Sequence, residues 1–426
     1  MDIHVVRPGD TLYELAYQYG VPMSRLIQDN QLPDPSRLAV GQTLVIQYPR
    51  STCTVRFGDT LFSIARNAGI TLRQLLRNNP GLEGGDRIYP GQELVLSYQQ
   101  KKQGTLSVNG YAYPNIAPAL LQRTLPFLSS LAPFTYRPTV RGDLIPLADD
   151  AMVAEAQSMG VRPMLHLANL TEAGSFSGEL AHAILSGPEA RTRLANHLIA
   201  ILHQKGYRGI DVDLESIFPD DAQNYVRFLL LLRERLEPLG YPLLAALAPK
   251  ISAGQQGEIY QGHDYRGLGA AADGVLLMTY EWGYAFGPPM AVAPLDQVRK
   301  VVEYALTEIP AEKIWLGIPN YGYDWILSAP KGSRARSLSN PEAVSLAAQH
   351  YAAIRYDQRA QAPWFRYVDG HGQEHEVWFE DARSIRAKLA LAAEMELYGV
   401  GYWNLMRPFP QNWTILNSLY EIRAGD

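Results

Sequence analysis

Apolar residues in the first hundred positions alternate between short β-rich runs and segments with helical spacing. The runs at 5–6 and 44–46 favour strands. Between them, Leu12, Leu15 and Ala16 lie on one face of a helix. Thr11, with Glu14 three residues later, matches a capping box at the start of that helix. The pattern predicts a small unit in the order strand, helix, helix, strand.

This unit occurs twice. The segment His4-Val-Val-Arg-Pro-Gly-Asp-Thr-Leu12 recurs as Cys53-Thr-Val-Arg-Phe-Gly-Asp-Thr-Leu61. Each copy closes on a Gly-Gln pair that is followed by an aliphatic run. A repeat of this length is typical of a structural unit. We expect two βααβ domains at 1–48 and 51–98, and the polar stretch at 99–104 reads as a linker.

The remainder, 105–426, alternates strand-like apolar runs with amphipathic helices such as 222–236 and 295–306. Eight strands alternating with helices predict an α/β fold, a (β/α)8 TIM barrel. Further short β-rich runs predict an α+β insertion at about 345–382, before the last strand, which would wall one side of a cleft. The eight expected strands are 106–111, 131–136, 162–168, 209–214, 243–248, 274–280, 314–319 and 399–404.

Three carboxylates alternate with aliphatic residues in the fourth expected strand, Gly209-Ile-Asp211-Val-Asp213-Leu-Glu215. Successive side chains of a strand point to opposite faces, so Asp211, Asp213 and Glu215 share one face. Acids crowded in a barrel interior raise each other's pKa, which suits a general acid near neutral pH. Two alternatives are a strand with a solvated polar face and a divalent-metal site.

Composition narrows the classes of function. The 426 residues are 47% hydrophobic and 19% charged, with a net charge of −5 and no basic run, which argues against a nucleic-acid partner. The single cysteine, Cys53, excludes an intramolecular disulfide framework. We see neither a membrane-spanning run nor a signal peptide, and we expect a monomer with no cofactor, no metal and no membrane partner. The aromatic content, 10%, suits stacking on ring-shaped ligands.

The repeated unit resembles the LysM domain, which binds N-acetylglucosamine polymers such as peptidoglycan and chitin. The resemblance covers residues 1 to about 98 and implies a glycan groove between two loops in each copy. The alternative is that these residues only cap a helix. The implied glycan-binding residues are Gly9, Asp10, Thr11, Leu12 and Asn30, and in the second copy Gly58, Asp59, Thr60, Leu61 and Asn79.

The acidic strand resembles the D-x-x-D-x-D-x-E motif of glycoside hydrolase family 18. Asp211, Asp213 and Glu215 match its last three acids, and Arg208 stands at the first acid position. The resemblance implies substrate-assisted catalysis through an oxazolinium ion, with Glu215 as acid and then base. Asp213 would orient the substrate's acetamido group, Asp211 would tune Asp213, and Tyr280 would bond the acetamido oxygen. The implied substrate-binding residues are Trp403, Met278, Glu281 and Tyr111.

Two LysM copies ahead of such a barrel resemble the spore cortex-lytic N-acetylglucosaminidases of endospore-forming bacteria, as do the runs at 278–284, 287–294 and 377–381. This implies a peptidoglycan hydrolase that is made in the mother-cell cytoplasm and deposited at the spore coat or cortex. One alternative is a chitinase or chito-oligosaccharide hydrolase. Another is a non-catalytic glycan-binding or spore-coat protein, against which the retained Glu215 argues.

Overall fold

A computed structural model describes residues 1–82 and 87–425. Its largest sheet is a parallel barrel in which the last strand, β20, pairs with the first, β5. The third strand has two parts, β9 and β10, separated only by Met164. The predicted (β/α)8 architecture is therefore confirmed. The barrel strands are β5 (Gly104–Ala112), β6 (Ser130–Pro133), β9 (Arg162–Pro163), β10 (Leu165–Ala168), β11 (Ile210–Asp213), β12 (Leu243–Leu247), β13 (Gly274–Leu277), β14 (Ile314–Pro319) and β20 (Gly399–Trp403).

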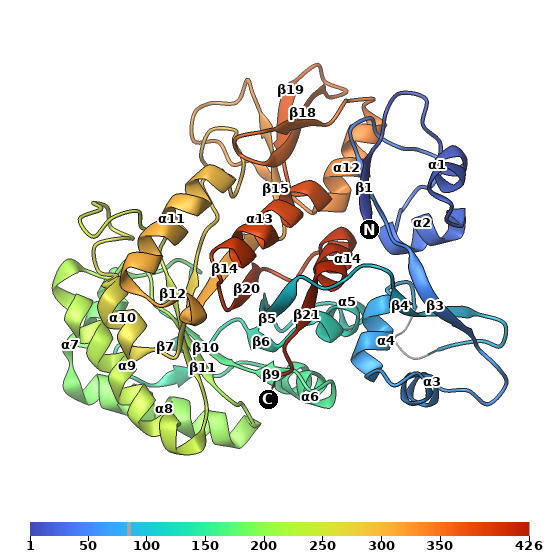
Figure 1. Ribbon diagram of the computed structural model, residues 1–426. Helices are drawn as coiled ribbons and strands as arrows, with labels where there is room; N and C mark the ends of the chain where they lie inside the picture. The colour runs from blue at the N-terminus through green and yellow to red at the C-terminus, as the bar shows by residue number, and fades with distance from the viewer. Residues whose placement is uncertain (83–86, 426) are drawn as a thin grey trace.

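Helices surround the barrel (Figure 1). The predicted helix 222–236 is found at the same residues as α9, and the one expected at 295–306 continues two residues further as α11. Three short strands, β7 (Arg137–Pro138), β8 (Leu144–Ile145) and β21 (Tyr420–Ile422), complete this part. The helices are α5 (Pro118–Thr124), α6 (Asp150–Ser158), α7 (Gly178–Ser186), α8 (Pro188–Lys205), α9 (Ala222–Leu236), α10 (Tyr265–Ala271), α11 (Leu295–Glu308), α13 (Ala382–Glu394) and α14 (Pro410–Leu419), with a 3-10 turn, η1 (Leu125–Phe127), after α5.

The insertion between β14 and β20 is a five-stranded antiparallel sheet with one helix, α12 (Asn340–Gln349). It begins well before the expected position 345. Its first strand, β15, pairs with β19 across about fifty intervening residues. No local sequence pattern indicates a pairing between strands so far apart in the chain. Its strands are β15 (Gly322–Ile326), β16 (Arg336–Leu338), β17 (Arg355–Asp357), β18 (Ala362–Val368) and β19 (Glu374–Trp378).

Each N-terminal repeat folds as a βααβ unit with its own small apolar core. The two outer strands of each unit pair antiparallel, β1 with β2 and β3 with β4. We call the units the first and second module. The first contains β1 (Asp2–Val5), α1 (Leu12–Tyr19), α2 (Met23–Asn30) and β2 (Thr43–Ile46), and the second β3 (Pro49–Thr54), α3 (Leu61–Asn67), α4 (Leu72–Asn78) and β4 (Glu93–Tyr98).

Both modules are fixed to one flank of the barrel, next to α14 and α5 (Figure 1). From the second module, Arg77 donates to the carbonyl of Pro126 at 3.0 Å and Arg73 donates to the carbonyl of Gly160 at 3.1 Å. From the first, Gln47 donates to the Ser418 hydroxyl at 2.7 Å. The bonds from Arg77 and Gln47 are buried and therefore costly to break, so the modules are held in place against the barrel.

No helix in the described part of the chain is long and apolar enough to cross a membrane.

Candidate functional site

The two sides of the barrel wall have different partners, as the alternation in the acidic strand predicts. Ile210 and Val212 of β11 pack outward among the helices. The barrel interior has a separate apolar cluster that includes Tyr111 and Trp315, with Met278 and Trp403 packed against it. Asp211 and Asp213, one residue out of phase with Val212, are buried on the inward side of this wall. Glu215 follows at the carboxyl end of the strand, where TIM barrels carry their sites.

Asp211 is the deepest of the three acids and is completely buried. Its Oδ2 accepts a hydrogen bond from the Tyr111 hydroxyl at 2.7 Å. Burial raises its pKa to about 6, although the bond from Tyr111 acts in the opposite direction. Tyr111 is itself 3% exposed. The structure places the Tyr111 hydroxyl against Asp211, and the contact of Tyr111 with substrate stays a prediction.

Asp213 and Glu215 lie in a site where ionisation is costly. Burial, followed by the charges of Glu215 and Asp211, raises the pKa of Asp213 well above its ordinary value. Burial raises the pKa of Glu215 from 4.5 to about 7. Asp213 Oδ1 has no hydrogen-bond partner among the described residues, and its Oδ2 lies 3.8 Å from His166 Nε2. Glu215, a carboxyl with a pKa near neutral, thus lies close to a buried Asp213 oxygen that has no partner among the described residues.

The backbone around Glu215 is held by two buried side chains from neighbouring loops. Asn169 accepts from the Glu215 N–H at 2.9 Å and donates to the Glu215 carbonyl at 2.8 Å. His263 accepts from the Ala248 N–H at 3.0 Å, which leaves its Nε2–H to donate to the Leu214 carbonyl at 3.1 Å. Asn169 and His263 therefore fix the position from which the Glu215 carboxyl projects.

The two bonds between Asn169 and the backbone of Glu215 predict a defect in turnover for a variant that lacks them. In Asn169→Ala the Glu215 N–H and carbonyl lose their buried partner, which we expect to cost about 1–3 kcal/mol of stability. We expect kcat to fall by about 10-fold or more with KM little changed, because the Glu215 carboxyl is misplaced while the other contacts of the site remain. Steady-state kinetics with Ser175→Ala, an exposed residue of the same loop, as control would check this. A rise in KM at unchanged kcat would contradict it.

Aromatic rings form a wall beside the acids. Trp403, at the end of β20, lies edge-on to Phe134 at 4.7 Å between ring centroids and 6.0 Å from Tyr111. Tyr280 and Trp403 also pack against an aromatic cluster of the insertion. Burial raises the pKa of Tyr280 well above its ordinary value, so its hydroxyl keeps its proton as a donor. The predicted residues Tyr280, Trp403 and Met278 therefore border one region.

Glu281 has a different environment from the three acids. Its Oε1 accepts from the Tyr323 hydroxyl at 3.1 Å and also from the Tyr321 hydroxyl. Tyr323 belongs to β15, and Tyr321 is the residue immediately before that strand. Glu281 therefore ties the loop after β13 to the base of the insertion.

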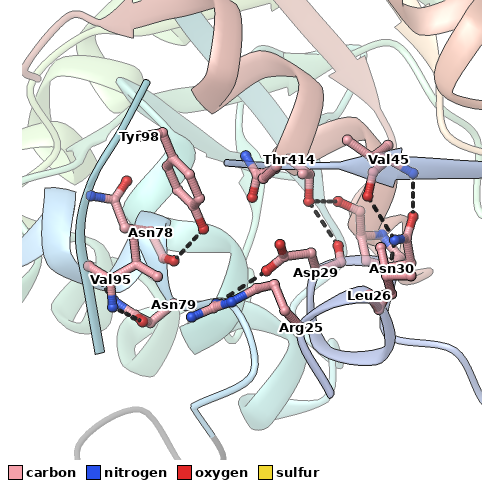
Figure 2. Close-up of polar contacts among 12 residues, drawn as sticks. Arg25, Leu26, Asp29, Asn30, Val45, Asn78, Asn79, Val95, Tyr98 and Thr414 are labelled. Carbon is pink, nitrogen blue, oxygen red and sulfur yellow. Dashed lines mark hydrogen bonds and ion pairs between the residues drawn. The ribbon is translucent and has the colours of Figure 1, made fainter. Parts of the chain in front are cut away.

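The two asparagines that were predicted to line glycan grooves are used within the modules. Asn30 donates to the carbonyls of Leu26 and Val45 and accepts from the Val45 N–H at 2.7 Å (Figure 2). Asn79 makes the equivalent bonds and accepts from the Val95 N–H at 2.8 Å (Figure 2). The two side-chain amides join the second helix of each module to the last strand of that module. Neither amide has an N–H left to donate to a sugar.

The Gly-Asp-Thr-Leu loops also stabilise the turns and helix starts of the modules, as the capping interpretation predicted. Asp10 and Asp59 each accept a backbone N–H from the turn before them, at 2.7 Å in both modules. Thr11 and Thr60 cap α1 and α3. In the same loops, Gly9 and Gly58 have positive φ. The side chains of Leu12 and Leu61 lie in the module cores.

A cavity lies where the second module was predicted to bind a glycan. It has a volume of about 520 Å³, which is in the usual range for ligand pockets. Thr60, Leu61 and Asn79 contribute to its lining, together with residues of α5 and α6. The corresponding region of the first module, which begins at Asn30 at the end of α2, packs against α12 and α14 and leaves only about 50 Å³.

The raised pKa of Glu215 has a consequence for stability. A carboxyl whose pKa is higher in the folded state stabilises the fold fully below the unfolded pKa, about 4.5, and this stability is lost as pH rises through about 7. Glu215→Gln removes that loss. We expect the free energy of unfolding of this variant, relative to the parent, to increase by at most about 3 kcal/mol between pH 5 and pH 8. Urea unfolding at both pH values checks this, with the exposed Glu258→Gln as control. An equal difference at both pH values would contradict it.

Sequence reasoning missed Asn169 and His263 as supports of Glu215. Asn169 directly follows β10, and this place at the end of the third barrel strand was the available signal. Arg208 is exposed and stands before β11, so the basic side chain brings no charge into the buried cluster. Among the described residues, no three His, Cys, Asp or Glu side chains converge in a way that could hold a metal ion.

Comparison with known families gives two matches. The model of glycosyl hydrolases family 18 matches residues 152–407. The LysM domain model matches residues 4–47 and 53–97. The two matches fall on the barrel and on the two modules, respectively.

Relatives share this arrangement along nearly the whole chain. A protein of Bacillus subtilis named cortical fragment-lytic enzyme is 41% identical over 99% of both chains. The crystal structure of the Bacillus megaterium spore cortex-lytic enzyme SleL superposes with a TM-score of 0.84 at 35% identity, covering 99% of this chain and 98% of that one. A chitinase from Chromobacterium violaceum, 27% identical, covers 74% of this chain and 98% of its own with a TM-score of 0.69.

Proposed function

Because the chain belongs to glycosyl hydrolases family 18, we propose that it is a peptidoglycan N-acetylglucosaminidase that cuts β-1,4 bonds after N-acetylglucosamine in the spore cortex. The observation that carries the proposal is the Asp213–Glu215 pair. Burial raises the pKa of Glu215 to about 7, so a large fraction of this carboxyl carries a proton near neutral pH, and Asp213 offers a buried acceptor without a partner among the described residues. A proton donor next to an acetamido-sized acceptor site is what substrate-assisted cleavage of an N-acetylated sugar requires.

In the first step, Glu215 gives its proton to the glycosidic oxygen as the bond from that oxygen to the anomeric carbon breaks. The carbonyl oxygen of the substrate's own 2-acetamido group bonds to the anomeric carbon and forms an oxazolinium ion. Asp213 gives its proton to Asp211 as the ion forms, accepts the acetamido N–H, and stabilises the positive ion with its negative charge. The Tyr280 hydroxyl donates to the acetamido oxygen, and Trp403 packs under the sugar ring.

In the second step, the Glu215 carboxylate takes a proton from water while the water oxygen bonds to the anomeric carbon. The bond from the acetamido oxygen breaks, and the configuration of the sugar is retained because two inversions have occurred. Asp211 acts through Asp213. The charge of the Asp211 carboxyl, which is held by Tyr111, raises the pKa of Asp213, and through this effect Asp211 controls the proton on Asp213.

The choice of peptidoglycan rests on the relatives. The cortical fragment-lytic enzyme and the spore cortex-lytic enzyme SleL match over nearly the full chain, modules included, whereas the chitinase match covers 74% of this chain. We place the enzyme at the spore cortex on the same ground, with the polymer as its partner.

A comparison of three polymers tests the proposal. Purified spore cortex, vegetative peptidoglycan and chitin would be digested with equal amounts of enzyme, and soluble fragments would be quantified by mass spectrometry. We expect cortex to release fragments fastest. If only chitin is cut, the chitinase alternative holds. If no polymer is cut while all three are bound, the chain is a glycan-binding protein.

A further inference from the structure

A cavity with a volume of about 1080 Å³ lies between the insertion and the loop that follows β13. One wall is the connection from β15 to β16, residues 329–336, and another contains residues 286–289 of the loop. The Trp325 Nε1–H donates to the Gly287 carbonyl at 2.9 Å. The insertion and the loop are therefore bonded to each other at this cavity.

The cavity adjoins the candidate catalytic region. Trp325 and Ala335 of its lining belong to the aromatic cluster of the insertion against which Tyr280 and Trp403 pack. The Ala335 N–H also donates at 2.6 Å to the carbonyl of Ala285, in the loop that follows β13. A polymer bound at the candidate catalytic residues can therefore continue along the insertion to this cavity.

Three cationic side chains on one wall of the cavity have no counter-ion from the protein. Lys331, Arg334 and Arg336 line the cavity and are exposed. Among the described residues, none of the three forms an ion pair with a carboxylate. The chain as a whole has a net charge of −5, so this local excess of positive charge departs from the average of the molecule. A cluster of this kind attracts the anionic groups of a ligand.

The two acids of the lining have other partners. Asp324, which is 4% exposed, accepts from the Tyr367 hydroxyl at 2.8 Å and lies 2.8 Å from His375 Nδ1. Asp369 accepts two backbone N–H groups of the turn between β18 and β19, each at 2.8 Å. Because both carboxylates are engaged in this way, the three cations remain available to a ligand.

The charge of Arg334 acts on the catalytic side of the insertion. Burial and the charge of Glu281 raise the pKa of the Tyr323 hydroxyl, which donates to Glu281. The charges of Arg407 and Arg334 act on this pKa in the opposite direction. Arg407 is bonded to the Ser337 hydroxyl at 3.0 Å, whereas Arg334 is exposed. The positive charge of the cavity therefore extends toward Glu281.

Carboxylates on a glycan match this lining. Two of the three cations are arginines, and a guanidinium binds a carboxylate through two parallel N–H···O bonds. Tyr284 and Phe286, which are 43% and 55% exposed, give the same cavity aromatic surface for a sugar ring or an apolar peptide side chain. Peptidoglycan carries carboxylates on its peptides, whereas chitin carries none. The lining therefore suits the charged polymer better than the neutral one.

We propose that Lys331, Arg334 and Arg336 bind the carboxylates of a peptide-bearing glycan strand that passes through the candidate catalytic region. This inference rests on the proposed function, because peptidoglycan is the polymer that carries these groups. It adds a binding site on the insertion that favours a charged glycan over a neutral one. The three side chains act on the choice of substrate and take no part in bond cleavage.

The indole N–H of Trp325 allows the cavity to be observed in the full chain, because Trp325 lines it. The protein would be labelled with 15N-tryptophan in a Glu215→Gln background, so that the ligand is not cut. The ligand is a peptidoglycan tetrasaccharide with its stem peptides and with its amines acetylated. One form keeps its carboxylates, and in the other form the carboxylates are converted to methylamides. NMR titration gives a Kd for each form, and Trp325→Phe assigns the signal.

We expect the Trp325 signal to report a Kd about 5-fold or more tighter for the carboxylate form than for the methylamide form at low salt. Replacing the three cations together, by Lys331→Gln, Arg334→Gln and Arg336→Gln, should bring this ratio close to one. The Trp413 ring stacks on Phe127. Its signal in the ligand-free spectrum should keep its position, which shows that the variant is folded.

The matched control removes the same charge from the outer helices. Arg227 of α9, Lys300 of α11 and Arg386 of α13 are exposed and lie outside the cavity lining. Changing these three residues to Gln should leave the ratio of Kd values at that of the parent. A fall in the ratio as large as that in the cavity variant would overturn the inference, since net charge alone would then select the ligand.

Three further outcomes would overturn the inference. The Trp325 signal could fail to move with either form, the two forms could bind equally, or their ratio could survive the loss of the three cations. If the two forms bound equally while inorganic phosphate shifted the Trp325 signal, the cations would form a phosphate site instead. Failure of the proposed function is a different result, since the parent enzyme would then release no fragments from any polymer, whatever the ratio at Trp325.

Discussion

Glu215→Gln is expected to lower kcat on an N-acetylglucosamine oligosaccharide by about 10³-fold, because an amide cannot give the glycosidic oxygen its proton. The substitution keeps the size of the side chain, and the Asn169 bonds that hold the backbone of residue 215 do not involve the carboxyl. We therefore expect KM to change little. Steady-state kinetics on a soluble chromogenic oligosaccharide measures both parameters.

The matched control is Glu281→Gln. Glu281 is the next glutamate in the same region, but its carboxylate is bonded to Tyr321 and Tyr323 rather than placed beside Asp213. We expect this variant to lose far less activity than Glu215→Gln. If the two variants lost equal activity, or if Glu215→Gln kept more than a tenth of the parent kcat, Glu215 would not be the acid.

Asp213→Asn is expected to have the second largest effect, a fall in kcat of about 10²-fold. Asp213 is proposed to bind the acetamido N–H most strongly once the oxazolinium ion carries a positive charge, so its contribution appears mainly in the transition state. KM should therefore change much less than kcat. The kinetic assay used for Glu215→Gln measures this split.

Asp211→Asn provides the comparison, because Asp211 is fully buried, is held by Tyr111 and acts only through Asp213. We expect its effect on kcat to be smaller than that of Asp213→Asn. A larger effect at Asp211 would mean that the deeper carboxyl, and not Asp213, stabilises the charged intermediate.

Much of the fold could be predicted because its patterns are local. The alternation in the strand containing Asp211 and Asp213 placed the acids on the inner side of the barrel wall, and the apolar spacing in α9 gave its two ends. The duplicated loop before Leu12 and Leu61 indicated both modules, which fold with the same order of elements.

The parts that escaped prediction depend on contacts between distant residues. The insertion begins at β15 because that strand pairs with β19. Nothing in the residues of either strand indicates which strand it pairs with. Asn169 supports Glu215 from 46 positions away, and such a bond has no local pattern. The amides of Asn30 and Asn79 bond to strand residues 15 and 16 positions further along the chain, and the resemblance that implied glycan contacts for them gave no sign of these bonds.

The central claim, cleavage after N-acetylglucosamine assisted by its own acetamido group, is tested most directly by the reducing ends that the enzyme creates. Peptidoglycan digested to completion would be reduced with borohydride, and the terminal sugar alcohols identified by mass spectrometry, with Glu215→Gln as the blank. The account predicts N-acetylglucosaminitol at the new ends and none above background with the variant. N-acetylmuramitol at the new ends, or N-acetylglucosaminitol formed equally fast by the variant, would contradict it.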